Sequence, residues 1–122
     1  MPHDPRKSLH DMLKAARLVL KFTAGRTQAD YKQDEFLRAA VERELEIVGE
    51  ALNRLLKAAP VIADQISEHR AIIQFRNVLA HGYDIVDDSL VWGLIEVKLP
   101  ILIAQVELLW NSFSDAPSDT SK

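Results

Sequence analysis

The segment 76–84 reads Arg-Asn-Val-Leu-Ala-His-Gly-Tyr-Asp, and its side chains are the best suited to chemistry in this chain of 122 residues. The guanidinium of Arg76 is always charged and is a planar fork that matches phosphate. The imidazole of His81 titrates near neutral pH and can therefore move protons. Together they suit RNA cleavage without a metal ion. His81 takes a proton from a ribose 2′-OH or gives one to the 5′-oxygen that leaves, and Arg76 stabilises the charge on the phosphorane. Asn77 can position a phosphate or the histidine, and Tyr83 can stack on a base or bond a phosphate.

The spacing of the arginine and the histidine leaves two ways for them to meet. Five residues apart on a continuous helix, Arg76 and His81 point about 140° apart around its axis. If the helix ends near Ala80, His81 can turn back toward Arg76. In a two-fold dimer, each copy can instead contribute its Arg76 and its His81 to one shared cleft. A third interpretation is purely structural, in which both side chains bond the last carbonyl groups of the helix.

Other kinds of site are weaker in this sequence. Cysteine is absent, and no Gly-x-Ser-x-Gly segment or glycine-rich phosphate loop is present, so we predict no cofactor. We also predict no metal site, because the other histidines lack acidic residues at ligand spacing: His3, His10 and His69. The net charge of −3 excludes a polybasic coat for nucleic acid. We expect two charged faces in solvent, one basic (Lys7, Lys14, Arg17 and Lys21) and one acidic (Glu42, Glu44, Glu46 and Glu50).

Apolar residues recur every three or four positions, which predicts an all-α chain: an up-and-down bundle of four main helices plus a short connecting helix. The expected helices are one that Ser8 caps and Gly25 ends, one of about 25 residues that Asp30 or Asp34 caps and that runs to about Ala58, a short one over 61–66 after Pro60, and one that Ser67 caps and Gly82 ends. The last expected helix runs from Leu90 to about Phe113, with Asp87 or Asp88 as its cap and a kink at Pro100.

Gly49 lies inside the second of these helices, where glycine costs about 1 kcal/mol relative to alanine. One reason for a glycine there is the close approach of another helix, either inside the bundle or across a dimer interface. We expect residues 1–113 to form a single domain and 114–122 to be a disordered tail. The N-terminus has no apolar leader, and charged residues interrupt the apolar stretch 90–110, so we expect a cytoplasmic protein with a buried last helix.

Three stretches of the sequence resemble the HepT-like branch of the HEPN superfamily. They are "RNVLAHGYDIVD", which holds an Arg-x-x-x-x-His-x-Tyr motif from Arg76 to Tyr83, "RAAVERELEIVGEALNRL", which includes Gly49-Glu50-Ala51, and "DDSLVWGLIEVKLPILIAQVELL", with its Leu99-Pro100 step. The arginine–histidine core alone is a loose pattern. Together with Asn77, Gly82 and the flanking helices it is fairly specific, and the resemblance spans about residues 8–112.

The resemblance implies a HEPN-like bundle that forms a homodimer with its active cleft at the dimer interface. It implies a metal-independent endoribonuclease, the toxin of a type VII-like HEPN/MNT toxin–antitoxin pair, with Arg76 and His81 catalytic and Asn77 and Tyr83 binding the RNA. The partner it implies is a minimal nucleotidyltransferase antitoxin, MntA-like, that transfers AMP to Tyr83. An anionic nucleotide beside the arginine and the histidine would block phosphate entry.

A second hypothesis is a non-catalytic helical module that docks the nucleotidyltransferase and presents its substrate. The acidic second half of the chain fits this alternative, since Asp84, Asp87 and Asp88 lie close to the motif and can attract a basic patch on the partner. RNA cleavage by the purified protein distinguishes the two hypotheses.

Overall fold

The computed structural model describes residues 4–80 and 87–115, and within these ranges the chain forms helices and no strand. The predicted all-α fold is confirmed. In chain order the elements are α1 (Pro5–Thr23), α2 (Gln28–Gln33), α3 (Glu35–Ala58), α4 (Pro60–Ala63), α5 (His69–Ala80), α6 (Asp88–Gly93), the π-helical turn η1 (Leu94–Lys98) and α7 (Leu99–Asp115).

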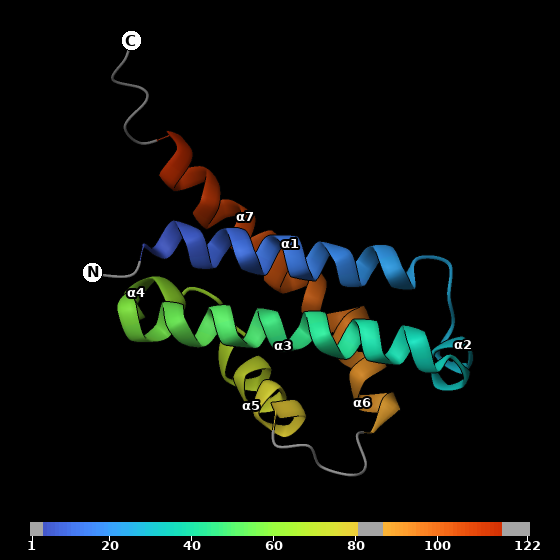
Figure 1. Ribbon diagram of the computed structural model, residues 1–122. Helices are drawn as coiled ribbons and strands as arrows, with labels where there is room; N and C mark the ends of the chain where they lie inside the picture. Colours follow the sequence, from blue (N-terminus) through green and yellow to red (C-terminus); the bar gives the residue numbers. More distant parts are fainter. Residues whose placement is uncertain (1–3, 81–86, 116–122) are drawn as a thin grey trace.

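Helix α3 lies at the centre of the arrangement (Figure 1). Its antiparallel neighbour α1 packs along one side and α5 packs on another, while α7 packs against α1. Since α6, η1 and α7 form one continuous helical segment, the four predicted main helices are α1, α3, α5 and this segment. Two short helices connect them, α2 and α4, where the sequence predicted one.

The first helix begins earlier than predicted. Asp4 is its N-cap, with a carboxylate oxygen 2.9 Å from the Arg6 backbone N–H, and Pro5 takes the first helical position. The predicted cap at Ser8 is wrong, because Ser8 lies inside the helix and is buried. A proline suits the first turn, where its missing N–H has no partner to lose. Gly25, with φ of +75°, follows the end of the helix as predicted.

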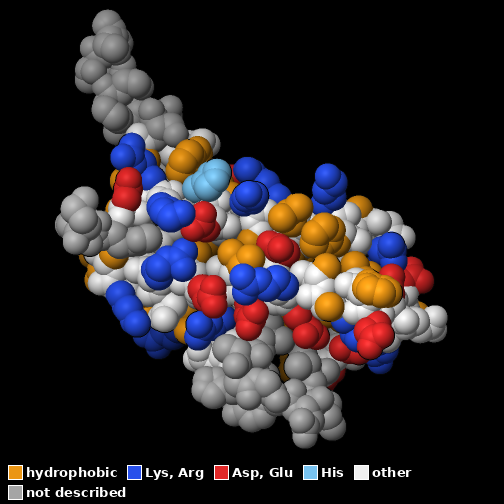
Figure 2. Space-filling model, in the orientation of Figure 1, with side chains coloured by type: hydrophobic (Ala, Val, Ile, Leu, Met, Phe, Trp, Pro, Cys, Tyr) orange, Lys and Arg blue, Asp and Glu red, His pale blue; other side chains and the backbone are white. Residues whose placement is uncertain are grey.

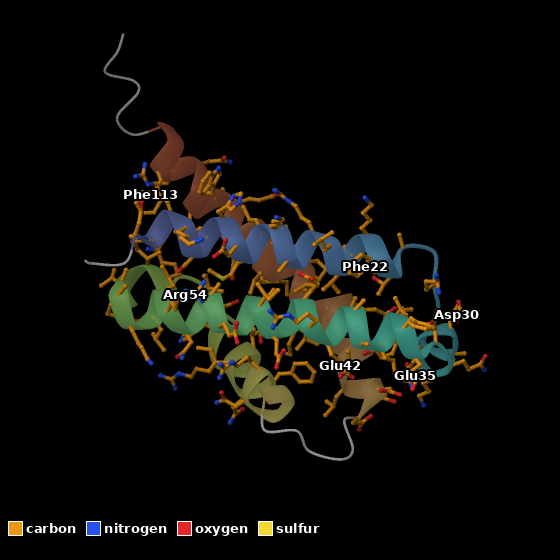
Figure 3. All side chains as sticks on the ribbon, in the orientation of Figure 1. Phe22, Asp30, Glu35, Glu42, Arg54 and Phe113 are labelled. Carbon is orange, nitrogen blue, oxygen red and sulfur yellow. The ribbon has the colours of Figure 1, made fainter. Side chains whose placement is uncertain are left out.

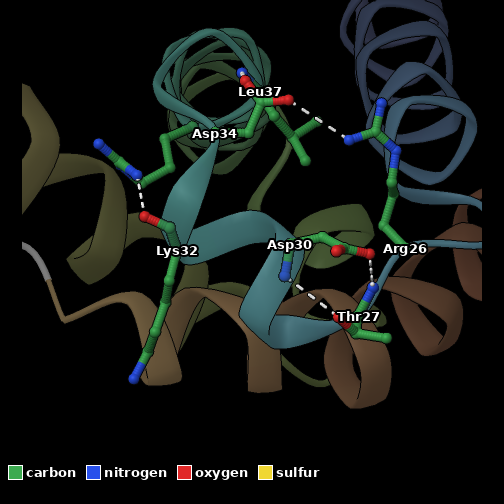
Figure 4. Close-up of polar contacts among 7 residues, drawn as sticks. Arg26, Thr27, Asp30, Lys32, Asp34 and Leu37 are labelled. Carbon is green, nitrogen blue, oxygen red and sulfur yellow. Dashed lines mark hydrogen bonds and ion pairs between the residues drawn. The ribbon is translucent and has the colours of Figure 1, made fainter.

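Both aspartates proposed as caps for the second main helix are used, one for each of two helices (Figure 4). Asp34 caps α3, where its carboxylate accepts the Leu37 N–H at 3.0 Å. This bond, together with the nearby Arg26, holds the pKa of Asp34 below its usual value. Asp30 belongs instead to a capping box with Thr27 that starts α2, a helix the apolar pattern did not reveal.

The predictions for the middle of the chain are partly right. Pro60 is the first residue of the short helix α4, as expected, although α4 ends at Ala63. Ser67 does not cap α5. Its backbone N–H donates to the Gln105 side-chain oxygen at 2.9 Å, which ties this turn to α7. The predicted stop at Gly82 lies outside the described residues.

At the start of the last helical segment, Asp87 caps α6 as predicted, since its side chain accepts the backbone N–H groups of Ser89 and Leu90. The π-helical turn η1 ends at Lys98, two residues before Pro100, where the kink was predicted, and the Leu99 N–H donates to the Leu94 carbonyl. A proline ring clashes with the carbonyl four residues earlier in a regular helix, and a wider turn relieves that clash. Helix α7 then continues through Asp115, so the first two residues of the expected tail are helical.

The last segment also supplies much of the core. Trp92 packs against the buried Tyr31, with ring centroids 5.6 Å apart. By length and hydropathy alone, Asp88–Phe113 is long and apolar enough to cross a membrane, but 44% of its most apolar window is buried inside the bundle. That burial and the packing against α1 agree with the predicted core helix.

Candidate functional site

Arg76 lies where α5 comes closest to α3. A Cβ atom built on Gly49 would stand 2.2 Å from the Cβ and 2.6 Å from the Cγ of Arg76, far inside any real contact between carbon atoms. The arginine stem therefore rests on the bare backbone of α3. Of the two reasons considered for Gly49, the structure supports close approach inside the bundle.

The guanidinium of Arg76 is held on two sides. Its Nη2 donates to the Glu50 carboxylate at 3.4 Å, and its Nη1 donates to the Asn77 side-chain oxygen at 3.2 Å. Its Nε is buried and has no hydrogen-bond partner among the described residues. A guanidinium has five N–H donors, and two of these belong to each terminal nitrogen. Two donors are engaged and one is buried, so each terminal nitrogen keeps one N–H that has no partner among the described residues.

The side chains of this pair are neither fully buried nor free in solvent. Arg76 is 26% exposed and Glu50 is 38% exposed. An anion that approaches from solvent can therefore reach the terminal nitrogens, while the buried Nε is closed to it. A phosphate would meet the end of the fork, formed by Nη1 and Nη2.

The structure brings two of the four predicted site residues together, Arg76 and Asn77 on α5. His81 and Tyr83 lie outside the described residues, so their meeting with Arg76 stays a prediction. Helix α5 is described up to Ala80, the residue directly before His81.

The acidic residues of α3 are less exposed than predicted. None of the four is fully exposed: Glu42, Glu44, Glu46 and Glu50. Glu42 lies on the side of α3 that faces α5 and α6 (Figure 3), and burial, followed by the charge of Asp88, raises its pKa. Glu50 contacts Arg76. The prediction of a solvated acidic face is therefore only partly right for these two residues. The sequence signals for Glu50 were its place next to Gly49 and the resemblance of the Gly49-Glu50-Ala51 stretch to the HepT-like branch.

The basic residues of α1 are exposed as predicted: Lys7, Lys14, Arg17 and Lys21. Acidic and basic side chains are mixed over the face of α1 and α3 (Figure 2). Arg17 bonds Glu107 of α7 at 2.6 Å, and Arg54 of α3 bonds Asp11 of α1 at 3.2 Å. A cavity of about 470 Å³ lies beside Lys14, Arg17 and Lys21. The ring centroids of Trp110 and His10, which also line it, are 6.0 Å apart. The mixture of charges agrees with the absence of a polybasic coat.

Among the described residues, no three histidine, aspartate or glutamate side chains gather in a group that could hold a metal ion. His69 makes local contacts: its Nδ1 lies 2.8 Å from the Ile66 carbonyl oxygen, and its Nε2 lies 3.7 Å from Asp64. His3 is outside the described residues.

Comparison with known proteins identifies relatives over most of the chain. Residues 12–109 match the family model described as "Ribonuclease HepT-like". A protein of Methanocaldococcus jannaschii that is provisionally named an RNase is 28% identical over 110 residues, which cover 87% of this chain and 96% of that protein. A protein of Thermococcus cleftensis, provisionally named ribonuclease HepT, is 28% identical over 109 residues, with 89% of this chain and 98% of that protein covered.

A third relative, from Caldanaerobacter subterraneus, is also provisionally named an RNase and is 29% identical over 103 residues, with 84% and 91% of the two chains covered. No solved structure matches the chain.

Proposed function

Because the chain belongs to the HepT-like ribonuclease family, we propose that it is a metal-independent endoribonuclease and the toxin of a HEPN/MNT toxin–antitoxin pair. The observation that carries the proposal is the guanidinium of Arg76, which two neighbouring side chains hold while one N–H of each terminal nitrogen has no partner among the described residues. Such a fork suits a phosphate that gains negative charge.

In the proposed reaction, the 2′-oxygen of a ribose attacks the adjacent phosphorus and the 5′-oxygen of the next nucleotide leaves. His81 accepts the 2′-OH proton or donates one to the leaving oxygen. Arg76 stabilises the dianionic phosphorane, Asn77 positions the phosphate, and Tyr83 contacts the RNA. The products are a 2′,3′-cyclic phosphate and a 5′-hydroxyl.

The test is cleavage of labelled RNA by purified, unmodified protein in the presence of EDTA. We expect fragments that end in 2′,3′-cyclic phosphate. Arg76→Ala and His81→Ala should each abolish cleavage while they keep the helical circular dichroism of the wild type. Undiminished cleavage by both variants would refute the catalytic assignment. If the wild type does not cleave RNA even at high concentration, the protein is better explained as a module that docks and presents a substrate to its partner.

We propose that the active form is a homodimer. On a continuous helix, Arg76 and His81 are expected to point about 140° apart, but in a shared cleft the arginine of one copy can meet the histidine of the other. The last helical segment leaves apolar side chains in solvent at intervals of seven, four and seven residues: Leu90, Val97, Ile101 and Leu108. A stripe of this kind suits helix packing between copies. Light scattering that gives the monomer mass of 13.8 kDa at all concentrations would contradict the dimer.

We propose further that an MntA-like nucleotidyltransferase neutralises the toxin by AMPylating Tyr83: the Tyr83 oxygen attacks the α-phosphorus of ATP and loses its proton, and pyrophosphate leaves. Asp87 and Asp88 lie at the start of α6, a few residues after Tyr83, and favour a partner with a basic patch. Co-expression with an MntA-like nucleotidyltransferase should add the mass of an adenylyl group, which is AMP less one water, to the wild type and not to Tyr83→Phe. RNA cleavage should stop in the modified protein alone. Both partners and the RNA would meet in the cytoplasm.

A further inference from the structure

Helix α3 lies directly under the proposed phosphate-binding arginine, and it offers two adjacent residues to that arginine. Gly49 supplies the bare backbone on which the Arg76 stem rests, and Glu50 supplies the carboxylate that meets Nη2 at 3.4 Å. Neither residue belongs to the arginine–histidine motif. They come from a different helix, 26 and 27 positions earlier in the chain.

The contacts determine which N–H groups of Arg76 can bind phosphate. Arginine can present a phosphate with the edge made by Nε and Nη2 or with the end made by Nη1 and Nη2. The edge is closed here because Nε is buried. Glu50 and Asn77 each accept a hydrogen bond from one terminal nitrogen, so among the described residues Nη1 and Nη2 each keep one further N–H.

We propose that Glu50 is a positioning residue of the ribonuclease site: it holds the Arg76 guanidinium so that its end, and not its edge, binds the phosphate. This inference rests on the proposed function. Glu50 does not touch RNA and takes no proton. It acts by limiting the rotation of a guanidinium whose two free N–H groups must face the phosphorane when its charge develops.

The surroundings distinguish this pair from the ordinary ion pairs of the surface. An exposed ion pair stabilises a protein little, because holding two long side chains in one geometry in water offsets most of the attraction between their charges. The Arg76 side chain can adopt few other conformations even without Glu50, because its stem packs against Gly49 and its Nε is buried. The same helix holds a matched control one turn earlier, where Arg43 and Glu46 also pair at 3.4 Å but Arg43 is 63% exposed.

The first experiment measures kcat and KM for RNA cleavage by Glu50→Ala, Glu50→Gln and Glu46→Ala, each per folded molecule. Glu50→Ala should lower kcat by about tenfold to a hundredfold, the usual effect of misplacing a catalytic group by about 1 Å. Its KM should stay equal or fall, because the freed guanidinium attracts RNA without a competing carboxylate. Glu50→Gln keeps an oxygen that accepts the Nη2 hydrogen bond and should recover most of kcat. Glu46→Ala should match the wild type.

The second experiment observes the guanidinium itself, so it does not depend on RNA cleavage. In ¹H–¹⁵N spectra, Arg76→Ala identifies the Nε–H signal of Arg76. We expect this signal to be protected from solvent exchange in the wild type and in Glu50→Gln, and to lose that protection in Glu50→Ala. If the wild type does not cut RNA, the proposed function fails, while this measurement still decides whether Glu50 holds the arginine.

Several results would overturn the inference. One is a kcat of Glu50→Ala within about twofold of the wild type, since misplacement of a catalytic group costs far more. A fall in kcat with an unchanged Nε–H signal would show that Glu50 acts in another way. Equal losses in Glu50→Ala and Glu46→Ala would assign the effect to surface charge. If Glu50→Ala does not fold, Glu50→Asp, which withdraws the carboxylate by one methylene, takes its place with the same expected fall in kcat.

Discussion

The contact between Gly49 and Arg76 provides a test of how the bundle supports the site. In Gly49→Ala the new methyl carbon would lie 2.2 Å from the Cβ of Arg76. Carbon atoms that do not share a bond prefer about 3.5–4.0 Å. Because the obstructing atom is a Cβ, side-chain rotation cannot remove it, and α5 itself must move away from α3 by more than about 1 Å.

The effect on stability should be modest. Overpacking of this kind costs about 1–3 kcal/mol, and the better helix propensity of alanine returns about 1 kcal/mol. The free energy of unfolding should therefore fall by about 0–2 kcal/mol, which lowers Tm by at most about 8 °C in a domain of this size.

The effect on RNA cleavage should be much larger. The bond from Arg76 to Glu50 is already 3.4 Å long, so any such shift of α5 breaks it and displaces the guanidinium. A displacement of about 1 Å at a catalytic group costs about a hundredfold in rate. We therefore expect Gly49→Ala to keep its fold and to lose about 99% of the cleavage rate of the wild type.

Thermal unfolding and RNA cleavage per folded molecule are the two assays. Gly93→Ala is the matched stability control, since Gly93 is also helical and a Cβ there meets nothing within 4 Å. That variant should be more stable than the wild type by up to about 1 kcal/mol. If Gly49→Ala gained stability as Gly93→Ala does and cut RNA at the wild-type rate, the packing of the Arg76 stem against Gly49 would not be needed to position the guanidinium.

Two further predictions concern the elements around the site. Burial and then the charge of Asp88 raise the pKa of Glu42, so its ionisation disfavours the fold as pH rises through the pKa of the folded state. Glu42→Gln should consequently raise Tm at pH 7 and change it little below the ordinary pKa of 4.5, where the carboxyl is protonated in both states; an equal gain at both pH values would refute the assignment. Asp87→Ala removes the cap of α6 and should cost about 1 kcal/mol, or about 4 °C in Tm, whereas Asp87→Asn, which keeps a capping oxygen, should cost little.

The positions of the helices could be predicted from the sequence because their causes are local. Apolar residues three or four apart, Asp34 before α3, Pro60 at the start of α4 and Asp87 before α6 all act within one turn of the chain. The error at Ser8 has the opposite cause. Its side chain resembled a cap in the sequence, but packing against the other helices buries it inside α1.

The sequence by itself also determined the residue types of the candidate site, since Arg76 and Asn77 are neighbours in the chain and their contact needs only a helix. The tertiary structure alone decided what supports them. Glu50 is 26 positions away and looked like one more solvated carboxylate, and Gly49 allowed two explanations. Spacing along a chain determines which face of a helix a residue occupies, but the angle and distance at which two helices cross depend on how all their side chains pack. That crossing set α5 on the bare backbone at Gly49 and so brought the Glu50 carboxylate to the guanidinium of Arg76.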